Sequence, residues 1–532
     1  MARLQPSEAE DLKRLMDLRE IGTLDQASLE RIHTELVSAG FNPVASDLRR
    51  WNGPAVDSFR PLTAASRMEI LFQDGWPNLH PKIFVKGIVG EHVNEEGEVC
   101  LWQSSDMSFQ WLTWDGIKAR IAEWCKKFQQ GFDRQDLVLD AHLYYEGKKS
   151  ELMALIDFKT LKSKPLSDGD CDDFFWTIRK PNLAIINSGK ADTNSISGRW
   201  YFRTDIKVPP RNFDIFRNVL TSAQQKNFDR GTKSIITGAQ NAQCLFILLW
   251  KTSRGLNALI VRAFKNSDGS LGTAALEAAP TDHESLKLRA GPDVTALDGQ
   301  KVVLFGAGAI GSHVALLLAE MGIKSLIICD YERLRPGNVV RHVAGQELIG
   351  YPKVFAVEQL IGQHAPWTTV TTIPVNSWNP ADLKRLIGEV NLIIDATGLA
   401  AFTDQLSRLA EQSGVSLVSI ALFRGGRLGR VRRQVAEKDV PIYRRHENTN
   451  DYPQIPPGRE EEEIAGLEAG CSAPIVNASP AVVQAVASLS ARIMTDLISR
   501  RFEFSEECVE VYRPIEKNPF SALGLLQLGK NS

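Results

Sequence analysis

One short segment, residues 301–312, constrains the fold of this chain more than any other. Its apolar run predicts a buried parallel strand, and the pattern G-x-G-x-x-G follows directly as Gly306, Gly308 and Gly311. The apolar spacing of residues 313–321 then predicts a helix. Because glycines let a backbone turn tightly and approach phosphate, and a helix start offers free N–H groups, this order predicts a nucleotide-binding βα unit.

Two further apolar runs, residues 325–329 and 390–395, predict buried strands that lead to an aspartate. Polar and charged groups that suit a nucleotide follow in this order: Asp330, Asn338, Arg341, Lys353 and Asp395. A nicotinamide site needs no such cations, whereas adenylate transfer does, because Arg and Lys neutralise the triphosphate and the departing pyrophosphate. We therefore expect ATP with Mg²⁺ rather than NAD. Asp330 is expected to hold a ribose hydroxyl and Asp395 the metal ion.

In order and spacing, these elements resemble the ThiF/MoeB and ubiquitin-activating enzyme superfamily over about residues 285–505. The matching residues are the glycine loop, Asp330, Asn338, Arg341, Lys353 and Asp395. The sequence departs at Thr397-Gly398, where the family often has a further Asp-Asn. The resemblance implies a Rossmann-like ThiF adenylation domain over residues 286–532, a homodimer, and a catalytic as well as nucleotide-binding role for Arg341. The alternative is a Rossmann domain with incidental charges.

Composition limits the class of protein. The 532 residues suffice for two to four domains, and 43% apolar and 24% charged residues are ordinary for a globular chain. A formal charge of −2 argues against a nucleic-acid-coating or membrane-surface protein. No apolar run has the length of a membrane span and the N-terminus is polar, so we expect a cytoplasmic protein. Seven scattered cysteines without a C-x-x-C pair predict neither a disulfide framework nor a structural zinc site.

The N-terminal region, residues 1–160, carries the second candidate site. Helical periodicity over residues 6–39, strand-like segments and a closing amphipathic helix over residues 111–128 predict an α+β domain. This order, with the aromatic-Pro-x-x-x-Pro-Lys pattern and a glycine shortly before Cys100, resembles the ubiquitin-conjugating enzyme fold. The resemblance implies that Cys100 accepts an activated protein as a thioester. The alternative is that Cys100 is a small core residue of an unrelated α+β domain.

The conjugating family's His-Pro-Asn tripeptide is missing here. His92 lies eight residues before Cys100, near the place of the family's asparagine. The resemblance therefore implies a catalytic His92 that donates a hydrogen bond to the developing oxyanion. The structural alternative is that its ring pins the turn over residues 94–97. Both interpretations stay open at this stage.

Residues 161–285 predict a β-rich middle domain, either a linker or a degenerate adenylation half. Further on, the basic run over residues 424–433 predicts a solvated hairpin or the border of a channel for a substrate tail. Residues 437–470 are polar and predict a long loop that ends at Cys471, shortly before a helix over residues 481–498. A nearby helix dipole favours a thiolate, so Cys471 is the expected activating-enzyme cysteine. The alternative is a loop cysteine without chemistry.

Together these features predict an α/β and α+β multidomain enzyme that most resembles the fused activating–conjugating proteins of bacterial CBASS anti-phage operons. That resemblance implies a protein substrate with a flexible C-terminal tail, a cGAS-like nucleotidyltransferase or a ubiquitin-like protein, and an acceptor amine on a target protein. Two competitors remain: a sulfur-carrier adenylyltransferase of cofactor biosynthesis, which has no use for Cys100, and a non-catalytic scaffold. We expect no nucleic acid and no membrane among the partners.

Overall fold

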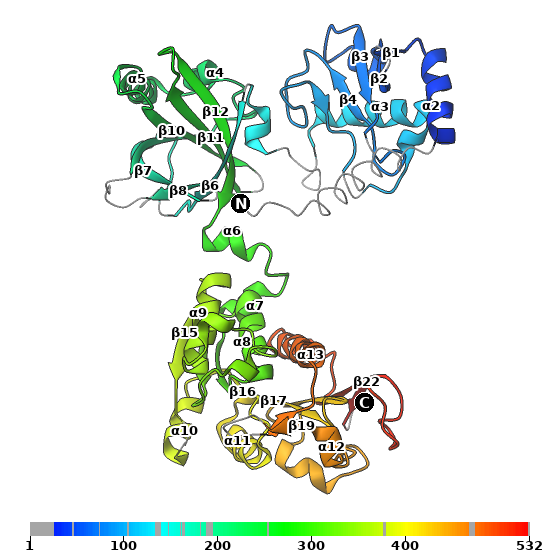
Figure 1. The fold of residues 1–532 in the computed structure, drawn as a ribbon, viewed down its shortest axis with the longest axis vertical. Helices are drawn as coiled ribbons and strands as arrows, with labels where there is room; N and C mark the ends of the chain where they lie inside the picture. Colours follow the sequence, from blue (N-terminus) through cyan, green and yellow to red (C-terminus); the bar gives the residue numbers. More distant parts are fainter. Residues whose placement is uncertain are drawn as a thin grey trace, which may run out of the picture. The chain divides into compact units, whose positions relative to one another are not determined.

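A computed structural model forms the basis of the structural description. It describes residues 26–44, 47–73, 75–103, 106–132, 140–146, 148–159, 161, 165–180, 182–187, 195–252, 255–375, 379–467 and 474–529. The chain divides into two compact units, Met1–Asp282 and His283–Ser532 (Figure 1). It has a mixed α/β multidomain fold with a C-terminal Rossmann-like region, as predicted.

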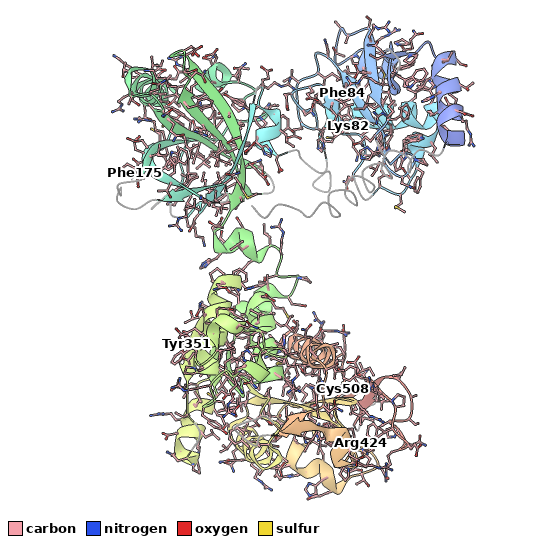
Figure 2. All side chains as sticks on the ribbon, in the orientation of Figure 1. Lys82, Phe84, Phe175, Tyr351, Arg424 and Cys508 are labelled. Carbon is pink, nitrogen blue, oxygen red and sulfur yellow. The ribbon has the colours of Figure 1, made fainter. Side chains whose placement is uncertain are left out.

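The first part of unit 1 is an antiparallel sheet packed against two helices. The sheet order is β1 (Asn42–Val44), β2 (Asp47–Pro54), β3 (Arg67–Leu71), β4 (Lys82–Val85) and β5 (Glu98–Val99). Burial alternates along β4, because Ile83 and Val85 are buried in the core while Lys82 and Phe84, labelled in Figure 2, lie on the other face and are partly exposed. The amphipathic faces of α2 (Gln26–Ser38) and α3 (Trp114–Gln130) fill that core with fully buried aliphatic and aromatic side chains.

The second part of unit 1 is a closed barrel with strand order β10-β11-β12-β6-β8-β7-β9. Its strands are β6 (Lys148–Ile156), β7 (Cys171–Arg179), β8 (Leu183–Asn187), β9 (Ile196–Arg203), β10 (Gln243–Thr252), β11 (Gly255–Lys265) and β12 (Leu271–Pro280). β10 is buried on both faces because Leu245 and Ile247 face the barrel core while Phe246 packs outward, in the cluster that includes α4 (Phe213–Asn218) and α5 (Ser222–Thr237).

The barrel bears on the two alternatives for residues 161–285, a linker domain or a degenerate adenylation half. The predicted strands there are present, but they do not form the parallel, helix-flanked sheet that an adenylation half requires. β6 precedes the predicted domain boundary at residue 160 and still pairs with β8 and β12, so the barrel includes residues from before that boundary.

Unit 2 is built on one eight-stranded sheet. The strand order is β15 (Thr369–Ile373), β14 (Ser325–Cys329), β13 (Lys301–Phe305), β16 (Leu392–Asp395), β17 (Ser416–Phe423), β18 (Leu428–Gln434), β21 (Glu507–Val511) and β22 (Gly524–Leu528). The first five strands run parallel and the last three are antiparallel additions. The chain moves from β13 outward to β15 and returns to β16 on the other side of β13. Ligands bind at such a switch point, beyond the carboxyl ends of the strands.

Helices cover both faces of this sheet. α8 (Ala309–Glu320), α9 (Lys353–His364) and α13 (Pro480–Ile498) contribute to one hydrophobic core, and α10 (Pro380–Ile387) with α11 (Ala400–Ser413) to the other. Among the described helices, α13 alone is long and apolar enough to cross a membrane by length and composition. The corresponding window is 61% buried and the helix packs on α8, which is typical of a core helix. Our statement that no apolar run reaches this length was therefore too strong.

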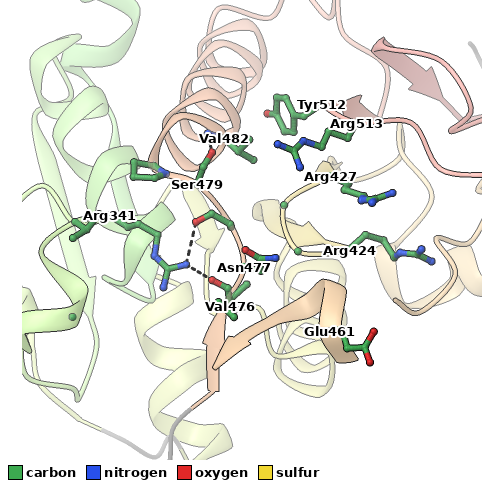
Figure 3. A pocket seen from close by; sticks show the side chains of 17 residues that line it. Arg341, Arg424, Arg427, Glu461, Val476, Asn477, Ser479, Val482, Tyr512 and Arg513 are labelled. Carbon is green, nitrogen blue, oxygen red and sulfur yellow. Dashed lines mark hydrogen bonds between the residues drawn. The ribbon is translucent and has the colours of Figure 1, made fainter. Parts of the chain in front are cut away.

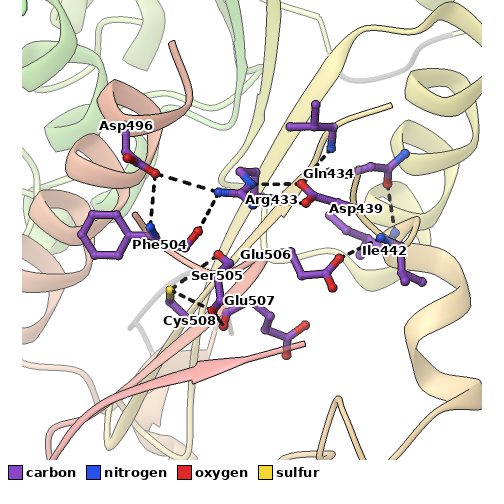
Figure 4. A network of polar contacts seen from close by, with 12 residues as sticks. Arg433, Gln434, Asp439, Ile442, Asp496, Phe504, Ser505, Glu506, Glu507 and Cys508 are labelled. Atoms are coloured by element: carbon purple, nitrogen blue, oxygen red, sulfur yellow. Dashed lines mark hydrogen bonds and ion pairs between the residues drawn. The ribbon is translucent and has the colours of Figure 1, made fainter. Parts of the chain in front are cut away.

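A buried polar network corrects two further predictions (Figure 4). The guanidinium of Arg433 donates to Asp439 at 2.9 Å and to the carbonyl of Phe504 at 2.8 Å, and Arg445 pairs with Glu507 at 3.3 Å. Arg433 and Arg445 are both buried; Arg433 lies on β18, an interior strand of the sheet, and Arg445 lies in the segment that follows this strand. The basic run is thus solvated only at its turn. The described part of the predicted loop over residues 437–470 is anchored by the short helix η6 (Ile442–Glu447) and by buried Tyr452.

Candidate active sites

The glycine loop has the geometry that phosphate binding requires. Gly306 has φ +90°, and a Cβ there would lie 2.9 Å from the backbone of Ala396. A Cβ on Gly311 would lie 1.8 Å from the carbonyl oxygen of Gly306, so neither position admits a side chain. A Cβ on Gly308 would meet no atom within 4 Å, and this residue lines a cavity.

α8 begins at Ala309, directly after Gly308 in the sequence. This start lies four residues before residue 313, where the apolar spacing predicts it. The difference arises because Gly311, the last glycine of the pattern, already lies in the first turn of the helix. No side chain caps this end, so its N–H groups remain available to an anion. The loop and the helix start therefore fit a phosphate chain.

Asp330 closes the loop from the neighbouring strand. One carboxylate oxygen accepts the N–H of Ala307 at 2.7 Å and the other the N–H of Glu332 at 2.8 Å. A cavity of about 350 Å³ opens here. Its lining includes Phe305, Gly306, Gly308, Asp330, Tyr331, Val375, Thr397, Leu399 and Phe402. An apolar wall beside a carboxylate suits a nucleoside, whose base is flat and whose ribose offers hydroxyl donors.

Lys353 is the first residue of α9 and is buried. Its ammonium pairs with the carboxylate of Glu332, and its backbone N–H donates to the carbonyl of the same residue at 2.9 Å. Glu332 in turn donates its N–H to Asp330. The structure thus brings Lys353 and Asp330 together through Glu332, a residue to which the sequence analysis assigned no role.

Asp395 ends β16 and is 1% exposed. Its carboxylate accepts from the hydroxyls of Thr397 at 2.6 Å, Thr403 at 2.5 Å and Ser419 at 3.3 Å. Among the described residues no group of three or more His, Cys, Asp or Glu forms a metal site. Mg²⁺ commonly binds through one or two carboxylates together with substrate phosphates, so a single aspartate is compatible with it. Asp395 remains the predicted metal ligand.

Arg341 lines a second cavity of about 620 Å³ (Figure 3), whose lining shares no residue with the cavity beside Asp330. Its guanidinium donates to the carbonyls of Val476 at 2.7 Å and Ala478 at 3.3 Å. These two hydrogen bonds hold the segment that leads into α13. Asn338 accepts the N–H of Arg335 at 3.1 Å and shapes the turn that carries Arg341.

His342 was not predicted as a site residue. Its Nε2 lies 2.9 Å from the carbonyl oxygen of Ala307 in the glycine loop, and its Nδ1 accepts the N–H of Ala344 at 3.0 Å. Because a carbonyl only accepts, the Nε2 carries the proton. Burial lowers the pKa of His342 to about 4, so the ring is neutral at pH 7. His342 therefore holds the glycine loop in place.

Cys100 follows the short strand β5. Burial and the carboxylate of Glu98 raise the pKa of this thiol to about 11, and the ammonium of Lys82 acts in the opposite direction. Glu98 is held by Lys82 at 3.3 Å and by the side-chain amide of Asn94 at 3.0 Å. The resting thiol is therefore protonated at neutral pH, and its reactivity depends on this charged pair.

The backbone around Cys100 is fixed by His92 and Tyr144. Cys100 donates its N–H to the carbonyl of His92 at 2.9 Å, and His92 donates its own N–H to the hydroxyl of Tyr144 at 3.2 Å. His92 has φ +61°, a left-handed conformation that costs energy for a side chain with a Cβ. Tyr144 is fully buried, and burial raises its pKa to about 12. No sequence signal pointed to Tyr144, which lies 52 positions after His92.

The ring of His92 is 4% exposed and packs against Phe132 with a centroid distance of 3.9 Å. The turn that follows is pinned by Asn94, whose side-chain oxygen accepts the N–H groups of Glu96 at 3.0 Å and Glu98 at 2.9 Å. Asn94 therefore pins this turn, and the structural alternative for His92 stays open beside the catalytic one. A catalytic role for His92 remains a prediction.

Cys471 lies outside the described residues, so its predicted role remains a prediction. The helix predicted behind it is present as α13, capped by Ser479, whose hydroxyl accepts the N–H of Val482 at 3.4 Å. Cys329 and Cys508 are buried in strands, and burial raises the pKa of Cys508 to about 11.

Comparison with known proteins identifies the region around the glycine loop. Residues 285–519 match the ThiF family. This region is a ThiF-family domain. Within this part of the chain, similarity extends to the molybdopterin-synthase adenylyltransferase of Escherichia coli, with 26% identity over 183 residues that cover 34% of the chain and 68% of that protein.

Two further relatives align over about a third of their own length. An uncharacterised protein of Sinorhizobium fredii, y4qC, is 28% identical over 196 residues, which are 34% of the chain and 34% of that protein. The ATP-dependent ubiquitin transferase-like protein Cap2 of Enterobacter hormaechei is 24% identical over 226 residues, which are 41% of the chain and 36% of Cap2. Among solved structures, Escherichia coli MccB superposes on 44% of the chain and 66% of its own with a TM-score of 0.35 and 14% identity.

Proposed function

We propose that this chain is an ATP-dependent enzyme that adenylates the C-terminus of a protein and transfers it, through thioesters, to an amine. The proposal rests above all on one observation. The glycine loop, Asp330 and Asp395 lie at the carboxyl ends of neighbouring parallel strands of one sheet, and Lys353 of α9 joins them through Glu332. The match of residues 285–519 to the ThiF family supports the same chemistry.

The first step needs a nucleotide held at its base, ribose and phosphates. The cavity beside Asp330 takes the nucleoside, and the uncapped start of α8 behind Gly308 takes the phosphates. Lys353 exchanges its contact with Glu332 for the more highly charged triphosphate. Mg²⁺ held by Asp395 neutralises phosphate charge when it is bound.

The tail that reacts enters through the second cavity, past Arg341 and the turn over residues 424–427. A carboxylate oxygen of the substrate attacks the α-phosphorus of ATP, the bond from that phosphorus to the bridging oxygen breaks, and pyrophosphate leaves. Arg341 supplies positive charge at the cavity wall, and its contacts with Val476 and Ala478 hold that wall in place.

The later steps use the two predicted thiols. The thiolate of Cys471 attacks the acyl carbon and AMP leaves; thioester exchange then passes the acyl group to Cys100, and an amine finally takes it and releases the thiol. The antiparallel meander of unit 1, with a helix before it and a helix after Cys100, supports a ubiquitin-conjugating-like role for residues 1–160. Covalent linkage of both thiols in one chain raises their effective concentration.

Similarity to the ubiquitin transferase-like protein Cap2 favours a defence function in which the substrate is a cGAS-like nucleotidyltransferase. A second candidate is a sulfur-carrier adenylyltransferase, because the molybdopterin-synthase adenylyltransferase aligns over 68% of its own length. The two differ in the use of Cys100. Only the first candidate loads this thiol, and a non-catalytic scaffold loads none.

Exchange of labelled pyrophosphate into ATP tests the proposal without the natural partner. The probes are synthetic peptides that end in Gly-Gly with a free carboxylate, and matched peptides with a C-terminal amide serve as controls. We expect exchange with the free carboxylates alone and, when the peptide carries a fluorophore at its N-terminus, a fluorescent thioester on Cys471 or Cys100 in non-reducing gels. Exchange without thioester on Cys100 would favour the sulfur-carrier candidate, and absence of any exchange with ATP would overturn the adenylation step.

A further inference from the structure

The cavity that Arg341 lines is unusually rich in arginine. Its lining contains Arg341, Arg424, Arg427 and Arg513 but only one acidic residue, Glu461. Figure 3 shows Arg341 on one side of the cavity and Arg427 with Arg513 on the other. The cations therefore approach the same space from different elements.

The fold itself forces two of these cations together. The carbonyl of Arg427 accepts the N–H groups of both Tyr512 at 2.8 Å and Arg513 at 3.1 Å, so the backbone fixes Arg427 and Arg513 side by side. Within the described part of the chain, neither guanidinium has a hydrogen bond or an ion pair. Like charges held at close range repel each other, and a bound anion relieves that repulsion.

Among the side chains that the structure describes, Glu461 included, no carboxylate forms an ion pair with Arg427 or Arg513. Glu463 accepts the backbone N–H groups of Arg424 at 3.1 Å and Gly425 at 3.0 Å and thereby shapes the turn. Glu510 accepts the hydroxyl of Tyr512 at 3.0 Å. Arg424 already donates to the carbonyl of Pro457 at 3.0 Å. The guanidinium groups of Arg427 and Arg513 are therefore available to bind a ligand.

The cavity also has the shape and polarity for a backbone. Small residues form much of its wall, and Gly426, with φ +84°, would bring a Cβ to 3.0 Å from Ala478. α13 begins here with Ser479 and Pro480, and its 19 residues direct the positive end of the helix dipole into the same space. The cavity beside Asp330 shares none of this lining. The base and ribose of ATP, placed beside Asp330, therefore leave the arginine-lined cavity to another ligand.

We infer that the C-terminal tail which this enzyme accepts is acidic, with Asp or Glu residues close before its terminal carboxylate. The inference rests on the proposed function and specifies its substrate class. Arg427 and Arg513 bind the acidic side chains and Arg341 faces them across the cavity. A basic tail is repelled by the same three guanidiniums, so the site selects its substrate by charge.

Three matched peptides test this inference. They share one length and a Gly-Gly carboxyl end, and carry three Glu, three Gln or three Lys before it, with a fluorophore at the N-terminus. Anisotropy measures binding without ATP, and pyrophosphate exchange measures the reaction. We expect the Glu peptide to bind about tenfold more tightly than the Gln peptide and the Lys peptide most weakly. The difference should shrink as KCl is raised from about 50 to 500 mM.

Charge reversal identifies the residues. Arg427→Glu and Arg513→Glu should each weaken binding of the Glu peptide about tenfold and shift preference toward the Lys peptide, whereas Arg427→Lys should keep the order. Arg289→Glu, an exposed arginine outside the cavity lining, is the matched control and should change nothing. Thermal unfolding of each variant separates loss of charge from loss of fold.

The outcomes separate this inference from the proposed function. Equal binding and exchange with the Glu and Gln peptides overturns the acidic tail while adenylation stands. Charge-selective binding without any exchange supports the acidic site and counts against adenylation. A rise in KM for ATP or pyrophosphate, with unchanged peptide binding in Arg427→Glu, makes the cavity a phosphate site and overturns the inference.

Discussion

The two candidate sites differ in how much of each could be recognised from the sequence. Around the nucleotide cavity, Asp330 reaches the glycine loop from the adjacent strand, and the carboxylate of Asp395 is held by Thr397, two positions away. Around Cys100, Glu98 lies two positions from the thiol and Lys82 eighteen, but the hydroxyl that accepts the N–H of His92 belongs to Tyr144, 52 positions after His92. The nucleotide site at the sheet edge can therefore be recognised from a sequence motif, whereas the contact that fixes the backbone near Cys100 arises only in the assembled fold.

The sites also differ in what burial does to them. Asp395 is buried and satisfied by hydroxyl donors, which stabilise a carboxylate in place. Cys100 is partly buried next to a carboxylate, which disfavours its thiolate. The carboxylate of Asp395 is thus already stabilised in its charged form, whereas formation of the Cys100 thiolate requires the charges beside it to rearrange.

The largest expected effect concerns Asp395. Asp395→Asn keeps the shape but removes the charge proposed to hold Mg²⁺, so we expect pyrophosphate exchange to fall by a hundredfold or more. Asp395→Ala should in addition lower the melting temperature, because the hydroxyls of Thr403 and Ser419 lose a buried acceptor worth about 1–3 kcal/mol each. Exchange at the native rate in Asp395→Asn would remove this residue from the site.

His342 makes stability at the nucleotide site depend on pH. Its folded pKa of about 4 lies below the ordinary value of 6.5, so the unfolded chain binds the extra proton and stability falls as pH drops from 6.5 to 4. The cause is burial, and the charges of Lys353 and His313 act in the same direction. The full effect is about 3 kcal/mol.

Urea unfolding of His342→Gln against pH checks this. An amide can still donate to the carbonyl of Ala307 but does not titrate, so this variant should lose the pH dependence between 6.5 and 4 while it keeps ATP binding. A pH profile that His342→Gln leaves unchanged would mean that the fold does not lower the pKa of His342.

A pair of neighbouring tyrosines sharpens the comparison at the thiol. Tyr144→Phe removes the acceptor of the His92 N–H, so we expect loading of Cys100 to slow about fivefold or more. Tyr145→Phe removes a similar buried hydroxyl that bonds Thr273 in the barrel at 3.0 Å, and it should leave loading unchanged. The readouts are the loading rate and its pH profile. Equal effects of both changes would reduce Tyr144 to a packing residue.

The smallest effect concerns the charges beside Cys100. Glu98→Gln should lower the pKa of the thiol from about 11 and speed its alkylation a few-fold, and Lys82→Met should slow it. Mass spectrometry of the Cys100 peptide after iodoacetamide treatment at several pH values measures both. Changes in the same direction in the two variants would contradict the electrostatic explanation.

The sequence was sufficient for the parts of unit 2 that depend on local pattern. The strands ending at Phe305, Cys329 and Asp395 appear as predicted, because buried parallel strands have continuous apolar runs. The start of α8 was missed, because Gly311 has low helix propensity yet lies in the first turn, where close packing excludes a Cβ.

Other features depend on tertiary contacts that no local pattern encodes. Arg433 and Arg445 look like solvated charges in the sequence, but the fold brings Arg433 to the carbonyl of Phe504, 71 positions away, and Arg445 to Glu507, 62 positions away. The link from Tyr144 to His92 is likewise set by the fold, not by spacing.

Calorimetric titration with ATP and with NAD, each with and without Mg²⁺, tests the central claim most directly, because it needs no protein partner. The account predicts Mg²⁺-dependent binding of ATP. Affinity should fall about tenfold or more in Lys353→Met, in which Glu332, half exposed, simply becomes solvated. Tight binding of NAD, with no binding of ATP to the wild-type chain, would contradict the adenylation account.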